Sequence, residues 1–180
     1  TIYNAISIDG FIAKEGRDSD WVSEVDVPYF EKAIKNAGCI IMGRKTFKQY
    51  EGELYPFEGV RNIVITRNPE EIGKYPNVMA TQNSPKQIRD MLENLGHKAA
   101  IIAGGGETNA SFLQARVVDE IILSVHPIII GKGIKLLKKS GISVDLGCLE
   151  LEASELNSAF SKNQTGTLLP LSCKGCTVMP

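Results

Sequence analysis

The sequence predicts an α/β fold in which a mostly parallel central sheet is flanked by helices and followed by a C-terminal antiparallel hairpin. Short apolar, β-branched runs alternate along the chain with segments of helical spacing. Glycine, proline, asparagine or aspartate bounds each apolar run, as is typical of strands. This alternation favours a parallel sheet, because parallel strands need crossover connections that are usually helical.

The strands of the central sheet are predicted at apolar runs that are rich in β-branched residues. They are residues 1–8 (TIYNAISI), 37–43 (AGCIIMG), 61–66 (RNIVIT), 77–81 (NVMAT), 98–105 (KAAIIAGG) and 119–130 (DEIILSVHPIII). Residues 148–156 and 166–173 follow each other without a helix between them, as the strands of an antiparallel pair do. Pro170 restricts the second of these to the edge of a sheet.

Helices are predicted over 27–37, 84–95 and 107–115, with a further short helix after Gly43. Ser84 followed by Pro85 is a favourable N-cap with a first-turn proline. No linker, repeat or low-complexity segment interrupts the chain, so we expect one domain over residues 1–180.

Composition excludes several functional classes. The chain of 180 residues is 43% hydrophobic and 23% charged, with a formal net charge of −1, which is typical of a globular protein and provides no basic surface for nucleic acid. Its longest apolar stretches are too short to span a bilayer, and no signal peptide pattern is present, so we expect no membrane partner and a cytoplasmic protein.

The cysteines do not indicate a metal site. Cys39 lies in an apolar run and is expected in the core. Cys173 and Cys176 form one C-x-x-C pair, but a zinc site needs a second pair of ligands. We therefore expect no bound metal.

Two segments indicate an anion site at one edge of the sheet. In GCIIMGRKTF and in AAIIAGGGETNASFL, a predicted strand ends in glycine and continues into a helix. Ligands of parallel sheets lie beyond the carboxyl ends of the strands, where helix N-termini attract phosphate. Arg44 and Lys45 follow one of these turns, and Arg67 follows a third strand. Three cations at such an edge favour NADPH over NADH, although tight packing of strand against helix explains the glycines equally well.

A second group of candidate residues lies between 9 and 30. Residues 9–20 are rich in glycine and charge and are expected to form a mobile loop over a site, followed by Trp21. Asp26 heads a predicted helix, with Phe30 one turn later on the same face. A carboxylate beside aromatic rings suits a flat, nitrogen-rich heterocycle, although Asp26 as a helix cap and Trp21 as a core residue are the structural alternatives.

These motifs resemble the dihydrofolate reductase-like superfamily, which includes the C-terminal reductase domain of the bifunctional riboflavin-biosynthesis deaminase-reductase. The resemblance rests on the segments IMGRKTF, AGGGETN and VVDEIILSVHPIIIGKG and on the stretch from Trp21 through Asp26 to Phe30. The resemblance implies that Asp26 is the active-site carboxylate with Ser124 as its hydroxyl partner. It also implies substrate contacts from Ala5, Trp21 and Phe30, and a cis peptide between two glycines of the triplet. The cofactor-binding residues that it implies are Ile12, Gly43, Arg44, Lys45, Thr46, Thr66, Arg67, Gly104, Gly105, Gly106, Glu107 and Thr108.

The activity implied is NADPH-dependent transfer of a hydride to a C=N bond of a pterin. Two alternatives are the 5-amino-6-(5-phosphoribosylamino)uracil reductase of riboflavin biosynthesis and a non-catalytic NADP-binding module. The arginine that precedes the third strand in dihydrofolate reductases is replaced here by Val60, and the aspartate-proline motif of the riboflavin reductases is absent from GRKTFKQYEGELYPF. The riboflavin-type branch also implies a homodimer through residues 118–133.

Overall fold

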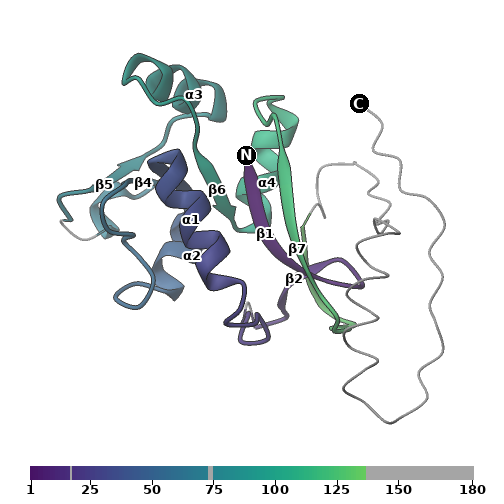
Figure 1. The fold of residues 1–180 in the computed structure, drawn as a ribbon. Helices are drawn as coiled ribbons and strands as arrows, with labels where there is room; N and C mark the ends of the chain where they lie inside the picture. Colours follow the sequence, from purple (N-terminus) through teal and green to yellow (C-terminus); the bar gives the residue numbers. More distant parts are fainter. Residues whose placement is uncertain (17, 73–74, 137–180) are drawn as a thin grey trace, which may run out of the picture. The chain divides into compact units, whose positions relative to one another are not determined.

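A six-stranded parallel sheet forms the centre of the protein (Figure 1). The computed structural model describes residues 1–16, 18–72 and 75–136. The strand order is β5-β4-β3-β6-β1-β7, and every neighbouring pair is parallel. The strands are β1 (Ile2–Ser7), β3 (Cys39–Gly43), β4 (Arg61–Ile65), β5 (Val78–Thr81), β6 (Ile101–Gly104) and β7 (Ile121–His126).

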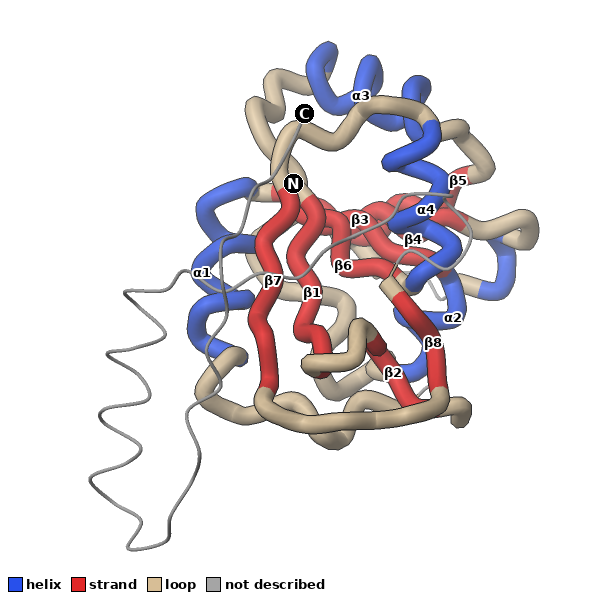
Figure 2. Tube along the Cα trace, turned by 90° about the vertical axis from the view of Figure 1, so that its right-hand side faces the viewer, coloured by secondary structure: helices blue, strands red, loops and turns tan. Residues whose placement is uncertain are grey.

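Helices cover both faces of this sheet. They are α1 (Val27–Ala37), α2 (Arg44–Gln49), α3 (Pro85–Asn94) and α4 (Gly106–Gln114), with a 3-10 turn η1 (Pro69–Glu71). Ile34 of α1 and Phe47 of α2 belong to one buried cluster, whereas Ile88 of α3 and Phe112 of α4 belong to the other. Figure 2 shows α1 and α4 on opposite sides of β1.

Alternation along the strands separates the two clusters. In β3, Ile40 and Met42 pack with α1 and α2, while Cys39 and Ile41 pack with α3 and α4. This follows from the period of two in a strand, and both faces are apolar because both are covered by helices. Cys39 is wholly buried, as expected, and burial raises the pKa of its thiol to about 12.

The predicted α/β fold with a parallel sheet is confirmed, and the helix predicted over 27–37 has those bounds. Ser84 caps α3 with a capping box: Gln87 N donates to Ser84 Oγ, and Ser84 N donates to the Gln87 side chain. The last strand is shorter than predicted and ends at His126 instead of residue 130. Pro127 follows it and has no N–H for a further ladder hydrogen bond.

One segment was misjudged from the sequence. Residues 9–20, which we expected to form a loop throughout, contain β2 (Phe11–Lys14), which pairs antiparallel with β8 (Gly133–Lys135) in a small second sheet (Figure 2). Phe11 and Ala13 are buried while Lys14 is exposed, so the pattern of a strand was present but short. The predicted hairpin over 148–156 and 166–173 lies outside the described residues, as do Cys173 and Cys176.

Two of the expectations drawn from composition concern membranes and metals. In the described part of the chain, each helix is too short or too polar to cross a bilayer. Over the same residues, His, Cys, Asp and Glu side chains do not gather into a cluster that would hold a metal ion. The expectation of a single domain over residues 1–180 stays a prediction.

Candidate functional site

The carboxyl ends of three neighbouring strands form one edge of the sheet. β4, β3 and β6 are adjacent and parallel, so the turns after Ile65, Gly43 and Gly104 lie side by side. The sequence predicted this from the residues that follow each strand. We call the residues at these turns the rim: Gly43, Arg44, Lys45, Thr46, Thr66, Arg67 and Gly104 to Thr108.

The two glycine turns of the rim are in direct contact. A Cβ atom added to Gly43 would lie 2.7 Å from Thr108 Oγ1, and one added to Gly105 would lie 3.3 Å from Thr46 Oγ1. A Cβ on Gly106 would lie 3.1 Å from the carbonyl oxygen of Lys135 in β8. Packing therefore explains part of the glycine triplet, but it also brings the starts of α2 and α4 together, where free backbone N–H groups attract anions.

Backbone conformation explains the first glycine of the triplet. Gly104 has a φ of +99°, which side-chain-bearing residues rarely adopt. The peptide bond between Gly104 and Gly105 is cis, as the resemblance implied. A Cβ on Gly106 would also lie 3.8 Å from Ile12 Cδ1, which places Ile12 beside the start of α4, as predicted for a cofactor contact.

A buried amide pair anchors α4 and was missed from the sequence. Asn109 is wholly buried in α4, and its Nδ2 donates to Asn4 Oδ1 of β1 at 2.7 Å. Asn109 Oδ1 is buried and has no hydrogen-bond donor in the part of the chain that the structure describes. The isolated asparagines gave no sequence signal, because their pairing depends on the contact between β1 and α4.

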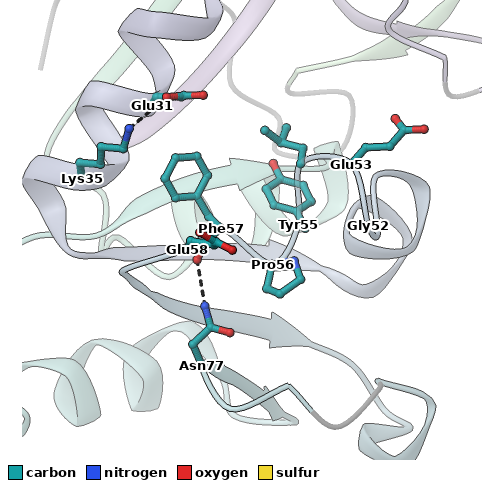
Figure 3. A pocket seen from close by; sticks show the side chains of 10 residues that line it. Glu31, Lys35, Gly52, Glu53, Tyr55, Pro56, Phe57, Glu58 and Asn77 are labelled. Carbon is teal, nitrogen blue, oxygen red and sulfur yellow. Dashed lines mark hydrogen bonds and ion pairs between the residues drawn. The ribbon is translucent and has the colours of Figure 1, made fainter.

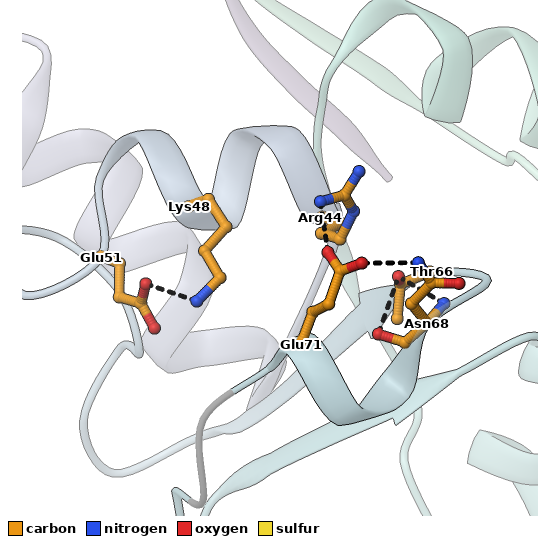
Figure 4. Close-up of polar contacts among 6 residues, drawn as sticks. All are labelled: Arg44, Lys48, Glu51, Thr66, Asn68 and Glu71. Carbon is orange, nitrogen blue, oxygen red and sulfur yellow. Dashed lines mark hydrogen bonds and ion pairs between the residues drawn. The ribbon is translucent and has the colours of Figure 1, made fainter.

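The cations of the rim differ in their surroundings. Arg44 Nη1 lies 2.5 Å from Glu71 Oε2, and Asn68 Nδ2 donates to the other oxygen of Glu71 (Figure 4). Thr66 Oγ1 accepts from Asn68 N at 3.1 Å, which fixes the turn after β4. Lys45 and Arg67 are exposed, and neither has an ion-pair partner among the described residues. The sequence predicted three cations here but not the carboxylate of Glu71 that pairs with Arg44.

Asp26 does not cap its helix. Its backbone is in the α region, and its carboxylate makes no capping hydrogen bond to α1. Instead, the Tyr3 hydroxyl donates to Asp26 Oδ1 at 2.8 Å. Burial and the bond to Asp26 raise the pKa of Tyr3, so its hydroxyl stays protonated and remains a donor. The cap interpretation of Asp26 is therefore wrong, and Tyr3 is a site residue that the sequence did not reveal.

Asp26 and Ser124 line the same open hollow of about 410 Å³ between α1 and β7. Its lining is Tyr3, Asp26, Tyr29, Lys32, Ala33, Asn36, Ile122, Leu123 and Ser124. The structure thus brings the predicted carboxylate and hydroxyl to one site, which we call the carboxylate hollow. They are not hydrogen-bonded to each other: the partner of Ser124 Oγ is His126 Nε2, at 3.4 Å.

The predicted substrate contacts lie around this hollow rather than in its lining. The Phe30 ring is 5.2 Å from the Tyr3 ring. Ala5 is the register partner of Ser124 across β1 and β7. The Trp21 ring lies edge-on to His126 with centroids 5.4 Å apart. Ala5 is thus a direct strand neighbour of Ser124, whereas Tyr3 lies between the side chains of Phe30 and Asp26, and His126 lies between those of Trp21 and Ser124.

A second hollow of about 580 Å³ lies between α1 and the segment 52–58, and includes none of the predicted site residues (Figure 3). Its charged lining is Glu31, Lys35, Glu53 and Glu58, and Lys35 Nζ is already paired with Glu31 at 3.1 Å. Phe57 and the buried Tyr55 supply the aromatic part of the wall. With more carboxylates than amines, this hollow is unsuited to a phosphate, so the rim stays the candidate anion site.

Curated relatives share most of the chain. The uncharacterized protein YwjB of Bacillus subtilis strain 168 is 26% identical over 140 residues, covering 75% of this chain and 80% of the relative. The uncharacterized protein YyaP of the same organism is 27% identical over 143 residues, covering 72% of this chain and 74% of the relative.

Solved structures share the fold. A protein of Shewanella sp. PV-4 that is assigned to riboflavin biosynthesis superposes with a TM-score of 0.62 at 21% identity, covering 80% of this chain and 85% of that one. A diaminohydroxyphosphoribosylaminopyrimidine deaminase/5-amino-6-(5-phosphoribosylamino)uracil reductase of Thermotoga maritima superposes with a TM-score of 0.61 at 21% identity. The match covers 81% of this chain but only 48% of the Thermotoga protein.

A family assignment agrees with this fold. The family described as the RibD C-terminal domain matches residues 1–158. This match spans every described element from β1 to β8. The protein belongs to the RibD C-terminal domain family.

Proposed function

We propose that the protein is an NADPH-dependent reductase of a substrate that carries a nitrogen heterocycle. The first candidate is a riboflavin-precursor-type pyrimidine, of which the ribose would accept the hydride. The contact between the two glycine turns is the observation that carries this proposal, since it brings the starts of α2 and α4 together at the sheet edge, where the phosphates of a dinucleotide would bind. Family membership supports a reductase and favours the riboflavin-type substrate over the pterin that we expected first.

The residues of the rim fit such a cofactor. Gly43 and Gly105 let the two turns approach each other, because a Cβ would lie 2.7 Å from Thr108 Oγ1 in the first case and 3.3 Å from Thr46 Oγ1 in the second. A pyrophosphate would bind to the backbone N–H groups where these turns meet. Lys45 and Arg67 are exposed cations that would bind the adenosine phosphate together with Arg44. When bound, NADPH supplies the hydride. Ile12 would lie along its nicotinamide half.

The carboxylate hollow would bind and orient the substrate. Tyr3 occupies one oxygen of Asp26, so the other is available to accept an N–H from a heterocycle. Ser124 is placed to contact the same ligand. Because Asp26 makes no capping hydrogen bond, its carboxylate could bind the amidine-like N–H groups of a pterin. This is the specific reason to keep a pterin as the second candidate. Positioning of the two reactants would supply most of the rate.

A comparison of substrates tests the proposal. Purified protein is mixed with NADPH and with 5-amino-6-(5-phosphoribosylamino)uracil or dihydrofolate, and the loss of NADPH absorbance is followed. Turnover of the first compound supports the riboflavin-type proposal, and turnover of dihydrofolate alone supports the pterin candidate. NADPH binding without turnover of either would favour the non-catalytic NADP-binding module.

We also propose that the protein forms a homodimer and is cytoplasmic. β7 is the last strand of the sheet among those described, and Ile121, Val125 and Ile129 along this edge are 42%, 57% and 77% exposed. Exposed apolar edges of this kind are typical of association surfaces. Light scattering at micromolar concentration is expected to give the mass of a dimer, and a monomer mass would contradict the dimer. Fractionation of cells tests the location.

A further inference from the structure

His126 is a buried histidine for which the proposed function has no role. It ends β7, is 7% exposed, and pairs in register with the wholly buried Ser7 of β1. Ser124 lies two residues earlier in the same strand, so both side chains are on one face of the sheet. His126 is therefore the neighbour, on the same face of β7, of Ser124, which lines the carboxylate hollow.

The hydrogen bonds of His126 define its tautomer. The backbone N–H of Ser23 donates to His126 Nδ1 at 3.4 Å. A backbone N–H can only donate, so Nδ1 carries no proton and the neutral ring has its proton on Nε2. Because Nε2 lies 3.4 Å from Ser124 Oγ, the imidazole donates to the hydroxyl oxygen.

This arrangement decides which way the Ser124 hydroxyl donates. An oxygen that accepts from His126 has its single proton free to donate elsewhere. The hollow that it lines also contains Asp26, of which one oxygen already accepts from Tyr3. The hollow therefore offers a ligand one hydroxyl donor and one carboxylate acceptor. A ligand edge with a carbonyl or ring nitrogen next to an N–H matches this pair, as in amide-containing pyrimidines.

Trp21 packs against His126 through its ring, and its own polar atom is unpaired in the described part of the chain. Its indole Nε1 is buried and has no hydrogen-bond partner among the described residues, and its ring packs edge-on against His126. Buried donors are almost always paired in folded proteins, so this unpaired N–H marks the surroundings of His126 as unusual.

We propose that His126 is a positioning residue: as the Nε2–H tautomer held by Ser23, it fixes the Ser124 hydroxyl as a donor toward the carbonyl or ring nitrogen of the heterocyclic substrate. This inference rests on the proposed function for the identity of the ligand. The tautomer and its coupling to Ser124 are properties of the free protein and do not depend on that function.

The first experiment reads the tautomer directly. The chain has two histidines, His97 and His126, so His97→Gln leaves His126 as the sole imidazole. Long-range ¹H–¹⁵N correlation spectra of this variant are expected to show a neutral ring protonated at Nε2, and adding Ser124→Ala is expected to shift the Nε2 resonance. A ring protonated at Nδ1, or an Nε2 chemical shift that is unchanged by Ser124→Ala, would overturn the proposal. No substrate is needed.

The second experiment reads the consequence for binding. His126→Phe keeps a ring against Trp21 but removes the donor, and it is expected to raise KM for the turned-over pyrimidine or pterin about tenfold. Ser124→Ala is expected to have a similar effect, and the double variant to be little worse than either single one, because both remove the same donor. His126→Gln, which retains an N–H, is expected to restore part of the loss.

A purely structural role gives a different pattern. His126→Phe would then weaken NADPH binding and substrate binding alike, and its effect would add to that of Ser124→Ala; this result overturns the proposal. His97→Gln is the matched control for the loss of a histidine, and its KM is expected to stay at the wild-type value. If neither substrate is turned over, the proposed function fails, and the tautomer spectra still decide the assignment of His126.

Discussion

The rim and the carboxylate hollow are built in different ways. The rim consists of backbone turns after β3, β4 and β6, and most of its predicted residues are near neighbours in sequence. The hollow is built from side chains on separate elements, with Tyr3 in β1, Asp26 at the start of α1, and Ser124 in β7. The rim is thus fixed by local turns at the centre of the sheet. The hollow instead depends on how α1, β1 and β7 pack together at the β7 edge of the sheet.

This difference suggests which property each region controls. Backbone N–H groups at helix starts bind phosphate whatever the neighbouring side chains are, so the rim is suited to a constant cofactor. Side-chain donors and acceptors determine which heterocycle fits, so the hollow is suited to bind a substrate that differs from one protein of this fold to another. Substitutions in the two regions are therefore expected to separate cofactor binding from substrate turnover.

The largest expected effect is at the rim. Gly105→Val is expected to abolish NADPH binding while the protein stays folded, because its side chain would enter the space for the pyrophosphate. The added Cβ would also lie 3.3 Å from Thr46 Oγ1. Fluorescence quenching by NADPH measures binding, and circular dichroism checks the fold. Normal binding by this variant would mean that the glycine serves packing alone.

Two controls separate occlusion of the cofactor from strain in the fold. Gly105→Val combined with Thr46→Ala removes the close contact, and it is expected to regain stability without regaining NADPH. Gly16→Val adds the same side chain where a Cβ would meet no atom within 4 Å, and it is expected to bind NADPH normally.

The next effect is at the hollow. Asp26→Asn keeps an oxygen for the Tyr3 hydroxyl, but it removes the charge that would hold and polarise the heterocycle. Turnover is expected to fall by ~10²–10⁴-fold, the range of general acid–base assistance, with NADPH affinity unchanged. Steady-state kinetics on the active substrate measure this, with the exposed Glu24→Gln as a control for loss of a carboxylate. Full activity in Asp26→Asn would exclude the carboxylate from the reaction.

A smaller effect concerns cofactor preference. NADPH is expected to bind more tightly than NADH by on the order of 1–3 kcal/mol, through charge-assisted contacts with the rim cations. Glu71→Gln would release Arg44 from its ion pair, and it is expected to tighten NADPH binding by about two- to fivefold with little change for NADH. Glu70→Gln, in the same turn, is the matched control. Equal dissociation constants for the two cofactors in the wild type would contradict the adenosine-phosphate assignment.

The smallest effect is a pH dependence outside both regions. Asp9 accepts from the Ser7 hydroxyl at 2.6 Å and from the backbone N–H groups of Ile130 and Gly131, and these bonds lower its pKa. A lowered folded-state pKa stabilises the fold at pH values above the ordinary carboxyl pKa of about 3.9, and this contribution is lost as pH falls through the folded-state pKa.

Asp9→Asn is therefore expected to be less stable than wild type at neutral pH and equally stable in acid. Urea unfolding across that range measures the difference. If the difference in free energy of unfolding between the two proteins does not decrease at low pH, the charge of the Asp9 carboxylate contributes nothing to stability.

The sequence predicted the central sheet and the rim better than it predicted the hollow. Periodicity and turn residues are local signals, so β3, α1 and the glycine turns were found within a few residues of their bounds. The bonds from Tyr3 to Asp26 and from His126 to Ser124 were not found, since they depend on how β1, β7 and α1 pack. β2 was missed because its partner β8 lies more than a hundred residues away.

The contact between Gly43 and Thr108 has a consequence for how the protein responds to its cofactor. β3 and β6, which precede these residues, are the two innermost strands of the sheet, so we expect the rim to open only when their pairing is lost. Ligand bound there would raise the free energy of global unfolding by RT ln(1 + [L]/Kd), and it would slow the amide hydrogen exchange of the inner strands that occurs through global unfolding. The same ligand would leave exchange at the α1 and β7 side to follow its own local fluctuations. Saturation with cofactor would therefore protect the amides at the centre of the sheet, while the local fluctuations that admit a substrate at the α1 and β7 side would continue.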